Sequence, residues 1–260
     1  MAAVVLMAAG CGGSSAAVSG SAATAGGGSI QAAGGSTAAV GGELTVFAAA
    51  SLTESFTGLG KGFEAANPGV HVRFNFAASS ALAQQINQGA PADVFASASP
   101  TNIAQVSVTG QPAVFARNLL EIAVPPGNAG KVTGLADLAR PELKIALCAE
   151  QVPCGAAART ALHAAGVTAA PDTLEQDVKA TLTKVVLGEV DAALVYRTDV
   201  KAAGDKVVGI PFPEAAKAVN DYPIAVLAQA PHAAAATAFV AYLLSEPGRT
   251  ALADAGFDLP

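Results

Sequence analysis

The chain has 260 residues, of which 52% are hydrophobic and only 13% are charged, and its net charge is −6. Because a nucleic-acid-binding protein needs a basic surface to neutralise phosphates, this acidic balance argues against a general nucleic-acid binder. No apolar run approaches the roughly 20 residues that a membrane-spanning helix requires, so the sequence also argues against an integral membrane protein.

The first 42 residues contain no charged side chain. An apolar run there ends in Ala8-Ala9-Gly10-Cys11, which resembles the end of a bacterial lipoprotein signal peptide. The resemblance implies that residues 1–11 are a signal-peptide remnant with its lipobox, and that a lipid on Cys11 anchors the exported protein to the outer face of the cytoplasmic membrane. The alternative is an alanine-rich terminus with an unpaired thiol. Residues 12–42 are rich in Gly, Ser and Ala and are expected to form a flexible tether, because they offer too little apolar area for a core.

From residue 43 onward, short apolar segments alternate with amphipathic ones. Ser51 and Glu54 match the capping-box pattern that begins a helix. The apolar face of that helix would consist of Leu52, Phe56, Leu59 and Phe63. Strands are predicted at residues 44–48, 71–76, 93–98, 119–124, 144–147, 192–196, 207–212 and 222–227. Helices are predicted at residues 51–66, 79–89, from 100, near 135–139, at 155–165 and 175–187, and from 232 onward. This alternation is typical of an α/β fold with parallel sheets covered by helices on both faces.

Three of the predicted strand-to-helix turns carry small hydroxyl or turn residues: 49–51, 77–80 and 152–155. In open α/β sheets, ligands bind beyond the carboxyl ends of the strands, where helix N-termini converge. These turns are therefore the expected place for a binding site.

Several motifs resemble those of the periplasmic molybdate-binding proteins of ABC importers. Residues 46–53, Val-Phe-Ala-Ala-Ala-Ser-Leu-Thr, are similar to the first strand and turn of that family. Residues 76–86 resemble its second ligand loop, and residues 89–95 resemble the segment that follows. Further similar segments are 152–155, 177–178, 194–196 and 221–226. The resemblance covers essentially all of residues 43–260.

This resemblance implies a two-lobed type II periplasmic-binding-protein fold with a ligand cleft between the lobes. One lobe would comprise residues 43–121 and 223–260, and the other residues 122–222, with crossings near Glu121-Ile122 and Tyr222-Pro223. The protein would capture molybdate, and also tungstate, by hinge closure and deliver it to an ABC permease. A monomer without a cofactor is expected, and molybdenum would enter only within bound molybdate, with no direct metal ligand from the protein.

The resemblance also implies five residues that bind the oxyanion: Ser51, Ser79, Cys154, Val178 and Tyr196. The two serines would use hydroxyl and backbone N–H groups, Cys154 and Val178 their backbone N–H groups, and Tyr196 its phenol. A tetrahedral dianion offers only acceptors, so its site needs donors. Helix N-termini supply unpaired N–H groups and the positive end of the helix dipole. We therefore expect neutral donors to hold the anion.

Cys148 and Cys154 lie six residues apart. If Cys11 carries a lipid, they form an even pair in an exported chain, which favours a disulfide. Two free buried thiols are the alternative, and a metal site would lack a third nearby ligand.

Two other functions use the same residues differently. A receptor for sulfate or another tetrahedral oxyanion would share this donor chemistry. A secreted α/β hydrolase would need a G-x-S-x-G nucleophile elbow, and none surrounds Ser51 or Ser79. The histidines are scattered along the chain, at His71, His163 and His232. We therefore expect a binding protein and not an enzyme.

Overall fold

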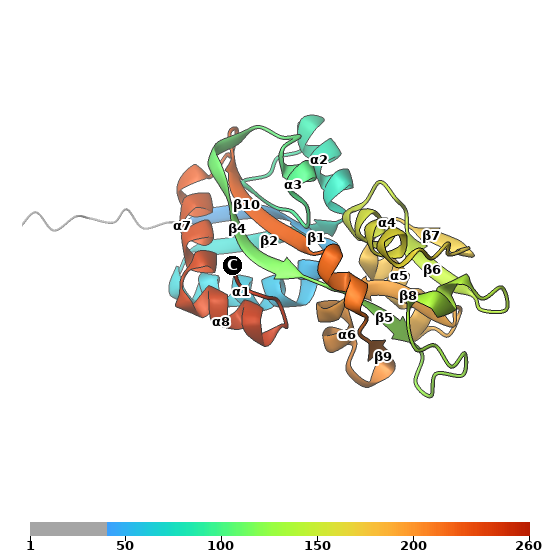
Figure 1. The fold of residues 1–260 in the computed structure, drawn as a ribbon. Coiled ribbons are helices and arrows are strands. Elements are labelled where there is room, and N and C mark those ends of the chain that lie inside the picture. Colours follow the sequence, from blue (N-terminus) through green and yellow to red (C-terminus); the bar gives the residue numbers. More distant parts are fainter. Residues whose placement is uncertain (1–40) are drawn as a thin grey trace, which may run out of the picture. The chain divides into compact units, whose positions relative to one another are not determined.

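The computed structural model describes residues 41–260 (Figure 1). The proposed lipobox with Cys11 and nearly all of the tether predicted at residues 12–42 lie outside the described residues. In the part of the chain that is described, no helix is both long and apolar enough to cross a membrane.

The first sheet has five strands in the order β2-β1-β3-β10-β4. Their bounds are β1 Gly42–Ala49, β2 Val70–Ala77, β3 Val94–Ala96, β4 Val108–Asn118 and β10 Asn220–Leu227. Strand β1 is parallel to β2 and β3, whereas β10 is antiparallel to both β3 and β4.

The second sheet also has five strands, in the order β7-β6-β8-β5-β9. Their bounds are β5 Leu120–Val124, β6 Ile145–Cys148, β7 Thr173–Glu175, β8 Ala192–Tyr196 and β9 Val208–Ile210. Strand β6 is parallel to β7 and β8, whereas β5 is antiparallel to β8 and β9. The expectation of purely parallel sheets was therefore wrong, because strands that enter a sheet directly from the other sheet need no crossover helix.

The helices are α1 Thr53–Ala66, α2 Ser79–Asn87, α3 Pro100–Ile103, α4 Pro153–Ala165, α5 Val178–Val186, α6 Arg197–Ala203, α7 Ala233–Leu244 and α8 Glu246–Asp254. Four short 3₁₀ turns are η1 Ala50–Leu52, η2 Leu135–Ala139, η3 Gly204–Lys206 and η4 Pro213–Lys217. The predicted helix at 175–187 corresponds to α5, which begins three residues later than expected. Strands β4 and β7 and helix α6 were not predicted.

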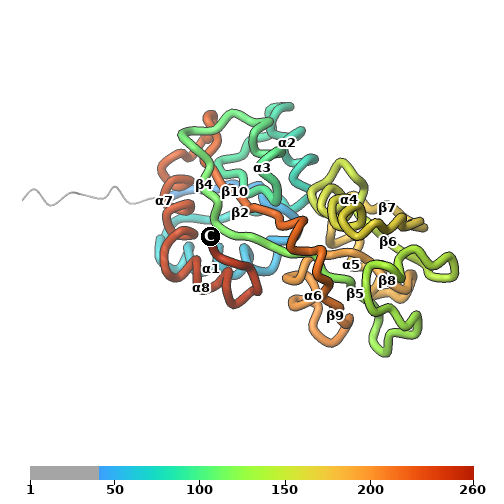
Figure 2. The backbone as a smooth tube through the Cα atoms, viewed as in Figure 1, coloured from blue at the N-terminus to red at the C-terminus, as the bar shows by residue number. Residues whose placement is uncertain are grey.

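The chain changes sheets twice, at positions that lie side by side. It leaves the first sheet after Asn118 and begins β5 at Leu120, and it returns at Asn220, which pairs with Asn118 (Figure 2). The predicted crossings at Glu121-Ile122 and Tyr222-Pro223 fall two to three residues later than these changes.

Each sheet has its own hydrophobic core. The predicted apolar face of α1 packs in the core of the first sheet, where its residues are almost fully buried. Ala50 and Ala78, which follow β1 and β2, pack with the core of the second sheet instead. The carboxyl ends of β1 and β2 therefore meet the second sheet, and this contact determines where a ligand can bind.

Candidate anion-binding site

Several helix starts converge on one small cavity with a volume of about 20 Å³. Its lining residues are Ala49, Ala50, Ser51, Ala78, Ser79, Ala98, Pro153, Cys154, Asp177, Val178 and Tyr196. They follow strands of both sheets, so neither sheet forms the cavity alone. All five residues expected to bind the anion are among them.

Backbone N–H groups at helix starts surround this cavity. Ser79 and Val178 are the first residues of α2 and α5, and Cys154 is the second residue of α4. The first turn of a helix has N–H groups without intrahelical acceptors, and the helix dipole makes that end positive. The three residues whose N–H groups are predicted donors therefore lie at helix starts that line the cavity.

Ser51 does not form the expected capping box. It lies in η1, and α1 begins at Thr53 without a side-chain cap. The Ser51 Oγ atom instead lies 2.9 Å from the Tyr222 hydroxyl of β10. The capping-box prediction was wrong because the 3₁₀ turn shifts the helix start, and the Glu54 side chain pairs with Lys179.

Ser79 is almost fully buried, and its hydroxyl oxygen accepts a hydrogen bond of 2.9 Å from the backbone N–H of Ala98. This contact uses one of the two acceptor lone pairs of the hydroxyl oxygen. The hydroxyl proton remains for a partner in the cavity.

The Tyr196 hydroxyl has no hydrogen-bond partner among the residues that the structure describes, although the side chain is only 1% exposed. Burial raises the pKa of this phenol well above its ordinary value, so the group keeps its proton. A buried O–H without an acceptor costs free energy, and a ligand oxygen in the cavity would remove that cost.

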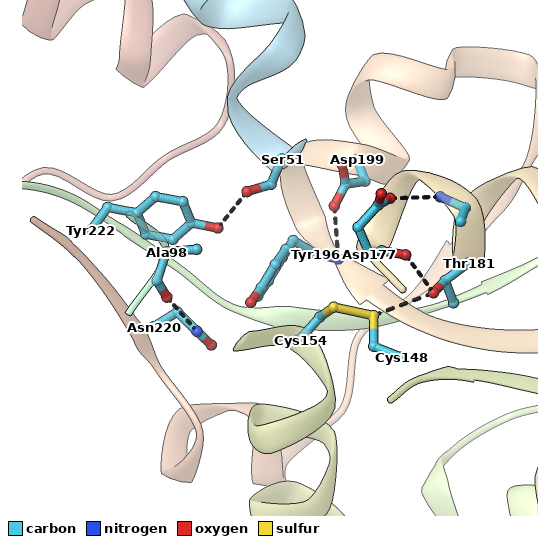
Figure 3. The surroundings of a disulfide bond; sticks show 11 residues. Ser51, Ala98, Cys148, Cys154, Asp177, Thr181, Tyr196, Asp199, Asn220 and Tyr222 are labelled. Atoms are coloured by element: carbon cyan, nitrogen blue, oxygen red, sulfur yellow. Dashed lines mark hydrogen bonds between the residues drawn. A yellow bond between two sulfur atoms is a disulfide. The ribbon is translucent and has the colours of Figure 1, made fainter. Parts of the chain in front are cut away.

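A disulfide joins Cys148, at the end of β6, to Cys154 in the first turn of α4 (Figure 3). The Cys148 Sγ atom also lies 3.2 Å from the Thr181 hydroxyl of α5, which donates to the Asp177 carbonyl oxygen over 2.9 Å. The disulfide expected from the cysteine pair is thus present and joins the end of β6 to the start of α4, and its Cys148 sulfur also contacts the first turn of α5.

The last position of the Val-Pro-Cys-Gly turn, residue 155, requires glycine. A Cβ atom at this residue would overlap the backbone of Ala149, which leads into the same turn. Only glycine therefore allows α4 to begin this close to the end of β6.

Asp177 is the one charged residue that lines the cavity. Its Oδ1 atom caps α5 by accepting a hydrogen bond of 2.9 Å from the Ala180 N–H. This carboxylate therefore stabilises the helix start, and the neighbouring Val178 N–H lies in the same first turn.

Lys179 follows Val178 directly, but its ammonium does not line the cavity. It lies 2.7 Å from Glu54 Oε2 and 2.9 Å from Asp199 Oδ1. Burial raises the pKa of Asp199 to about 6, although the attraction of Lys179 lowers it. No local pattern in the sequence indicates this cluster, because its three members come from α1, α5 and α6.

Within residues 41–260, no three His, Cys, Asp or Glu side chains lie close enough together to hold a metal ion. His232 lies beside Asp93, whose carboxylate accepts the His232 backbone N–H over 2.6 Å. This pair lies at the start of α7 and does not contribute to the cavity.

Comparisons with known proteins agree with this arrangement. A family model described as a bacterial extracellular solute-binding protein matches residues 44–258. The molybdate-binding protein ModA of Mycobacterium tuberculosis strain H37Rv is 44% identical over 221 residues, which cover 84% of this chain and 85% of that protein.

Two solved structures show the same fold. The periplasmic molybdate-binding protein of Azotobacter vinelandii matches with a TM-score of 0.72 at 20% identity, covering 84% of this chain and 99% of the other. The sulfate-binding protein SubI of M. tuberculosis H37Rv matches with a TM-score of 0.73 at 19% identity, covering 84% and 86%. At such identities these structures show the fold alone.

The expected two-lobed periplasmic-binding fold is therefore confirmed. Proteins of this family are extracytoplasmic solute receptors and not enzymes, which confirms that expectation as well. The chain belongs to the bacterial extracellular solute-binding proteins and, within them, to the family of the ModA proteins.

Proposed function

We propose that the protein captures molybdate outside the cytoplasmic membrane and delivers it to the permease of an ABC importer. The observation that carries this proposal is the small cavity lined by Ser51, Ser79, Cys154, Val178 and Tyr196. The 44% identity to the M. tuberculosis molybdate-binding protein supports the same ligand.

The donor chemistry of the cavity suits a fully deprotonated oxyanion. The Ser79 oxygen already accepts a hydrogen bond, and the Tyr196 phenol is a buried donor without an acceptor among the described residues. No lysine, arginine or histidine is among the lining residues. A dianion would be held by neutral donors and helix dipoles, which do not require a buried counter-charge.

The size of the cavity favours a compact ion. Its volume of about 20 Å³ accepts a single small group, whereas pockets for drug-sized organic ligands measure roughly 300–1,000 Å³. Molybdate and tungstate are both tetrahedral and carry the same charge, so we propose that tungstate also binds. Sulfate offers the same acceptors and is the second candidate ligand.

Capture requires the two lobes to separate and close. Ser79 and Tyr196 are each only 1% exposed, so an anion cannot reach them unless the cavity opens. The two adjacent crossings between the sheets, at residues 118–120 and near 220, are the natural hinge. We propose that the protein acts as a monomer and that the permease recognises the closed form.

Calorimetric titration of the protein with molybdate, tungstate, sulfate and phosphate tests this function. We expect molybdate and tungstate to bind tightly, sulfate more weakly, and phosphate not at all. If sulfate bound as tightly as molybdate, the proposed ligand would be wrong and an oxyanion receptor of broader range would remain. If none of the four bound, the receptor function itself would be contradicted.

The membrane anchor is a separate proposal that rests on the sequence Ala8-Ala9-Gly10-Cys11. Mass spectrometry of the protein extracted from bacterial membranes should find a diacylglycerol-modified Cys11 at the mature N-terminus. An unmodified Cys11 in the mature, membrane-associated protein would contradict the proposed anchor.

A further inference from the structure

A chain of buried side-chain contacts leads from the crossing between the sheets to the anion cavity. Asn118, the last residue of β4, has its Nδ2 atom 3.5 Å from the Tyr222 hydroxyl. The Tyr222 hydroxyl in turn lies 2.9 Å from the Ser51 hydroxyl. Asn118 and Tyr222 are fully buried, and neither lines the cavity, whereas Ser51 does.

The available donors and acceptors determine the direction of these hydrogen bonds. The Asn118 Nδ2 group can only donate, so the Tyr222 oxygen is the acceptor in the first contact. If Ser51 also donated to Tyr222, the remaining acceptor for the buried phenol proton would be the neighbouring Tyr196 hydroxyl, which makes no well-formed hydrogen bond with any described residue. The arrangement that uses the shortest contact for the phenol proton has Tyr222 donating to Ser51 over 2.9 Å, which leaves the Ser51 proton for the cavity.

The remaining contacts of Asn118 and Tyr222 fix the orientation of both side chains. The Asn118 Oδ1 atom accepts a hydrogen bond of 3.0 Å from the Leu119 N–H, which orients the amide. Its Nδ2 atom also donates to the Thr198 hydroxyl of α6 over 2.8 Å. The Tyr222 ring packs edge-on against three aromatic rings, those of Phe115, Tyr196 and Phe257. The phenol therefore has little freedom to turn away from Ser51.

The phenol also remains a donor across the physiological range. Burial raises the pKa of Tyr222 above its ordinary value, and the nearby Asp199 acts in the same direction. Its hydrogen bonds to Ser51 and Asn118 act in the opposite direction but do not cancel the effect of burial.

We propose that Tyr222 is a positioning residue that holds the Ser51 hydroxyl with its proton directed toward the bound oxyanion. This inference rests on the proposed function, because it gives one of the site's donors its direction. Ser79 resembles Ser51 in this respect, since its oxygen accepts a hydrogen bond from the Ala98 N–H. Tyr222 differs in that it lies beside the hinge, so the direction of the Ser51 proton depends on the contact between β4 and β10.

A hydroxyl whose proton is directed into the cavity discriminates between oxyanions by their protonation. Molybdate and sulfate carry no proton at neutral pH and accept from Ser51, whereas hydrogen phosphate would place a P–OH proton against some of the donors. Without the Tyr222 hydroxyl, the Ser51 oxygen becomes a free acceptor and its hydroxyl can turn. Loss of the hydroxyl should therefore weaken molybdate binding and relax the exclusion of hydrogen phosphate.

Tyr222→Phe tests the inference because it removes only the hydroxyl. We expect the Kd for molybdate to rise about tenfold, which corresponds to one lost hydrogen bond to a charged ligand. We also expect the ratio of the phosphate Kd to the molybdate Kd to fall by at least the same factor. Tyr242→Phe is the matched control, because Tyr242 of α7 packs against Phe63 and does not line the cavity. Its affinity and its selectivity should equal those of the wild type.

A double-mutant cycle separates positioning from general damage. In a Ser51→Ala background the Tyr222 hydroxyl has no serine to orient, so Tyr222→Phe should change the molybdate Kd less than twofold. Equal, additive losses in the two backgrounds, or an unchanged phosphate-to-molybdate ratio in Tyr222→Phe, would overturn the inference. The wild type and Tyr242→Phe bind molybdate in either case if the proposed function is right. Failure of both to bind would instead contradict the function.

If Tyr222→Phe does not fold, NMR of the wild type provides the test. The chain has only three tyrosines, so a ring-carbon label next to each hydroxyl gives three resolvable signals. We expect the Tyr222 hydroxyl proton to exchange slowly with solvent and to shift when molybdate binds. Rapid exchange in the molybdate-bound protein would contradict the inferred hydrogen bond to Ser51.

Discussion

At the scale of single residues, three polar side chains of the cavity have hydrogen-bond partners, whereas the Tyr196 hydroxyl has none among the described residues. The Ser79 oxygen accepts from Ala98 N–H, the Ser51 oxygen contacts Tyr222, and Asp177 caps α5. The residues that line the cavity could be identified from local motifs, because these motifs also specify helix starts. The partners could not, since Tyr222 lies 171 residues from Ser51 along the chain.

Removing either serine hydroxyl should weaken anion binding. We expect Ser51→Ala and Ser79→Ala each to cost about 1–3 kcal/mol of molybdate binding free energy, because a charged ligand loses a buried donor. Ser79→Ala should also lower the thermal stability of the ligand-free protein, since the Ala98 N–H loses its acceptor. Calorimetric titration measures the first effect and thermal unfolding the second.

Ser245→Ala is the control for both serine variants. The Ser245 hydroxyl donates to the Tyr242 carbonyl oxygen between α7 and α8, outside the cavity. Its loss should leave the molybdate affinity unchanged. Wild-type affinity in both Ser51→Ala and Ser79→Ala would rule out their proposed role in binding.

Because of Asp199, the folded protein should become less stable as the pH rises. Burial raises its pKa to about 6 in the folded protein, above the ordinary value near 4. The folded state therefore binds the proton more tightly than the unfolded state. Its contribution to stability is fully present below about pH 4 and is lost as the pH rises to about 6, by up to about 3 kcal/mol.

Urea unfolding of the wild type and of Asp199→Asn at several pH values measures this contribution. The difference in unfolding free energy between the two proteins should move against the wild type as the pH rises from 4 to 7. A constant difference across that range would show that the Asp199 carboxyl titrates normally.

At the scale of elements, most predicted helices and strands lie within three residues of those observed, and the missed elements are β4, β7 and α6. Helices α1, α2 and α4 follow an apolar periodicity or a turn motif that is visible in the sequence. Strand β4 is 11 residues long but contains Gly110 and Pro112, which interrupt the alternation by which strands are recognised. The three-residue β7 and seven-residue α6 are too short for periodicity to reveal.

The disulfide links two elements, because it joins α4 to β6. A double variant, Cys148→Ser with Cys154→Ala, should unfold at a lower denaturant concentration. Its free energy of unfolding should fall by about 2 kcal/mol, because the disulfide closes only a short loop. The affinity for molybdate should change little, since the backbone N–H of residue 154 remains. Urea unfolding and calorimetric titration of the same preparation distinguish the two effects.

In contrast, a variant that stays folded but loses most of its molybdate affinity would show that the disulfide orients the start of α4 for binding. The wild type under reducing conditions should then show the same loss.

At the scale of the whole described molecule, ion pairs join the helices of one sheet to those of the other. Lys179 of α5 contacts Glu54 of α1 over 2.7 Å. In the sequence, Lys179 follows the cavity residue Val178, and Glu54 lies shortly after the cavity residue Ser51. Arg197 of α6 contacts Asp258 over 2.9 Å in the C-terminal segment. The Lys179–Glu54 pair requires α1 and α5 to lie close together.

Glu54→Gln should therefore weaken the closed state. We expect the molybdate Kd to rise by about twofold to fivefold, mainly through faster release, because exposed ion pairs contribute roughly 0.2–1 kcal/mol. The effect should shrink at high salt, where the pair is screened. Stopped-flow release of molybdate at low and high ionic strength measures both quantities.

Glu43→Gln provides the matched control. Glu43 pairs with Arg73 over 2.6 Å, but both residues lie in the first sheet, on β1 and β2. Its removal should leave the release rate unchanged. Equal effects of Glu54→Gln and Glu43→Gln would mean that net charge, and not the contact between the lobes, determines release.

The sequence by itself determined the α/β class, the cysteine pair and the helix starts that supply donors, because these depend on residues close together in the chain. The tertiary structure alone decided the antiparallel entries of β5 and β10, the release of Ser51 from its expected cap, and the cluster of Glu54, Lys179 and Asp199. These features arise where the chain crosses between the sheets, so they bring together residues from distant segments. A side chain's hydrogen-bond partner there depends on packing across the crossing, which no local pattern encodes.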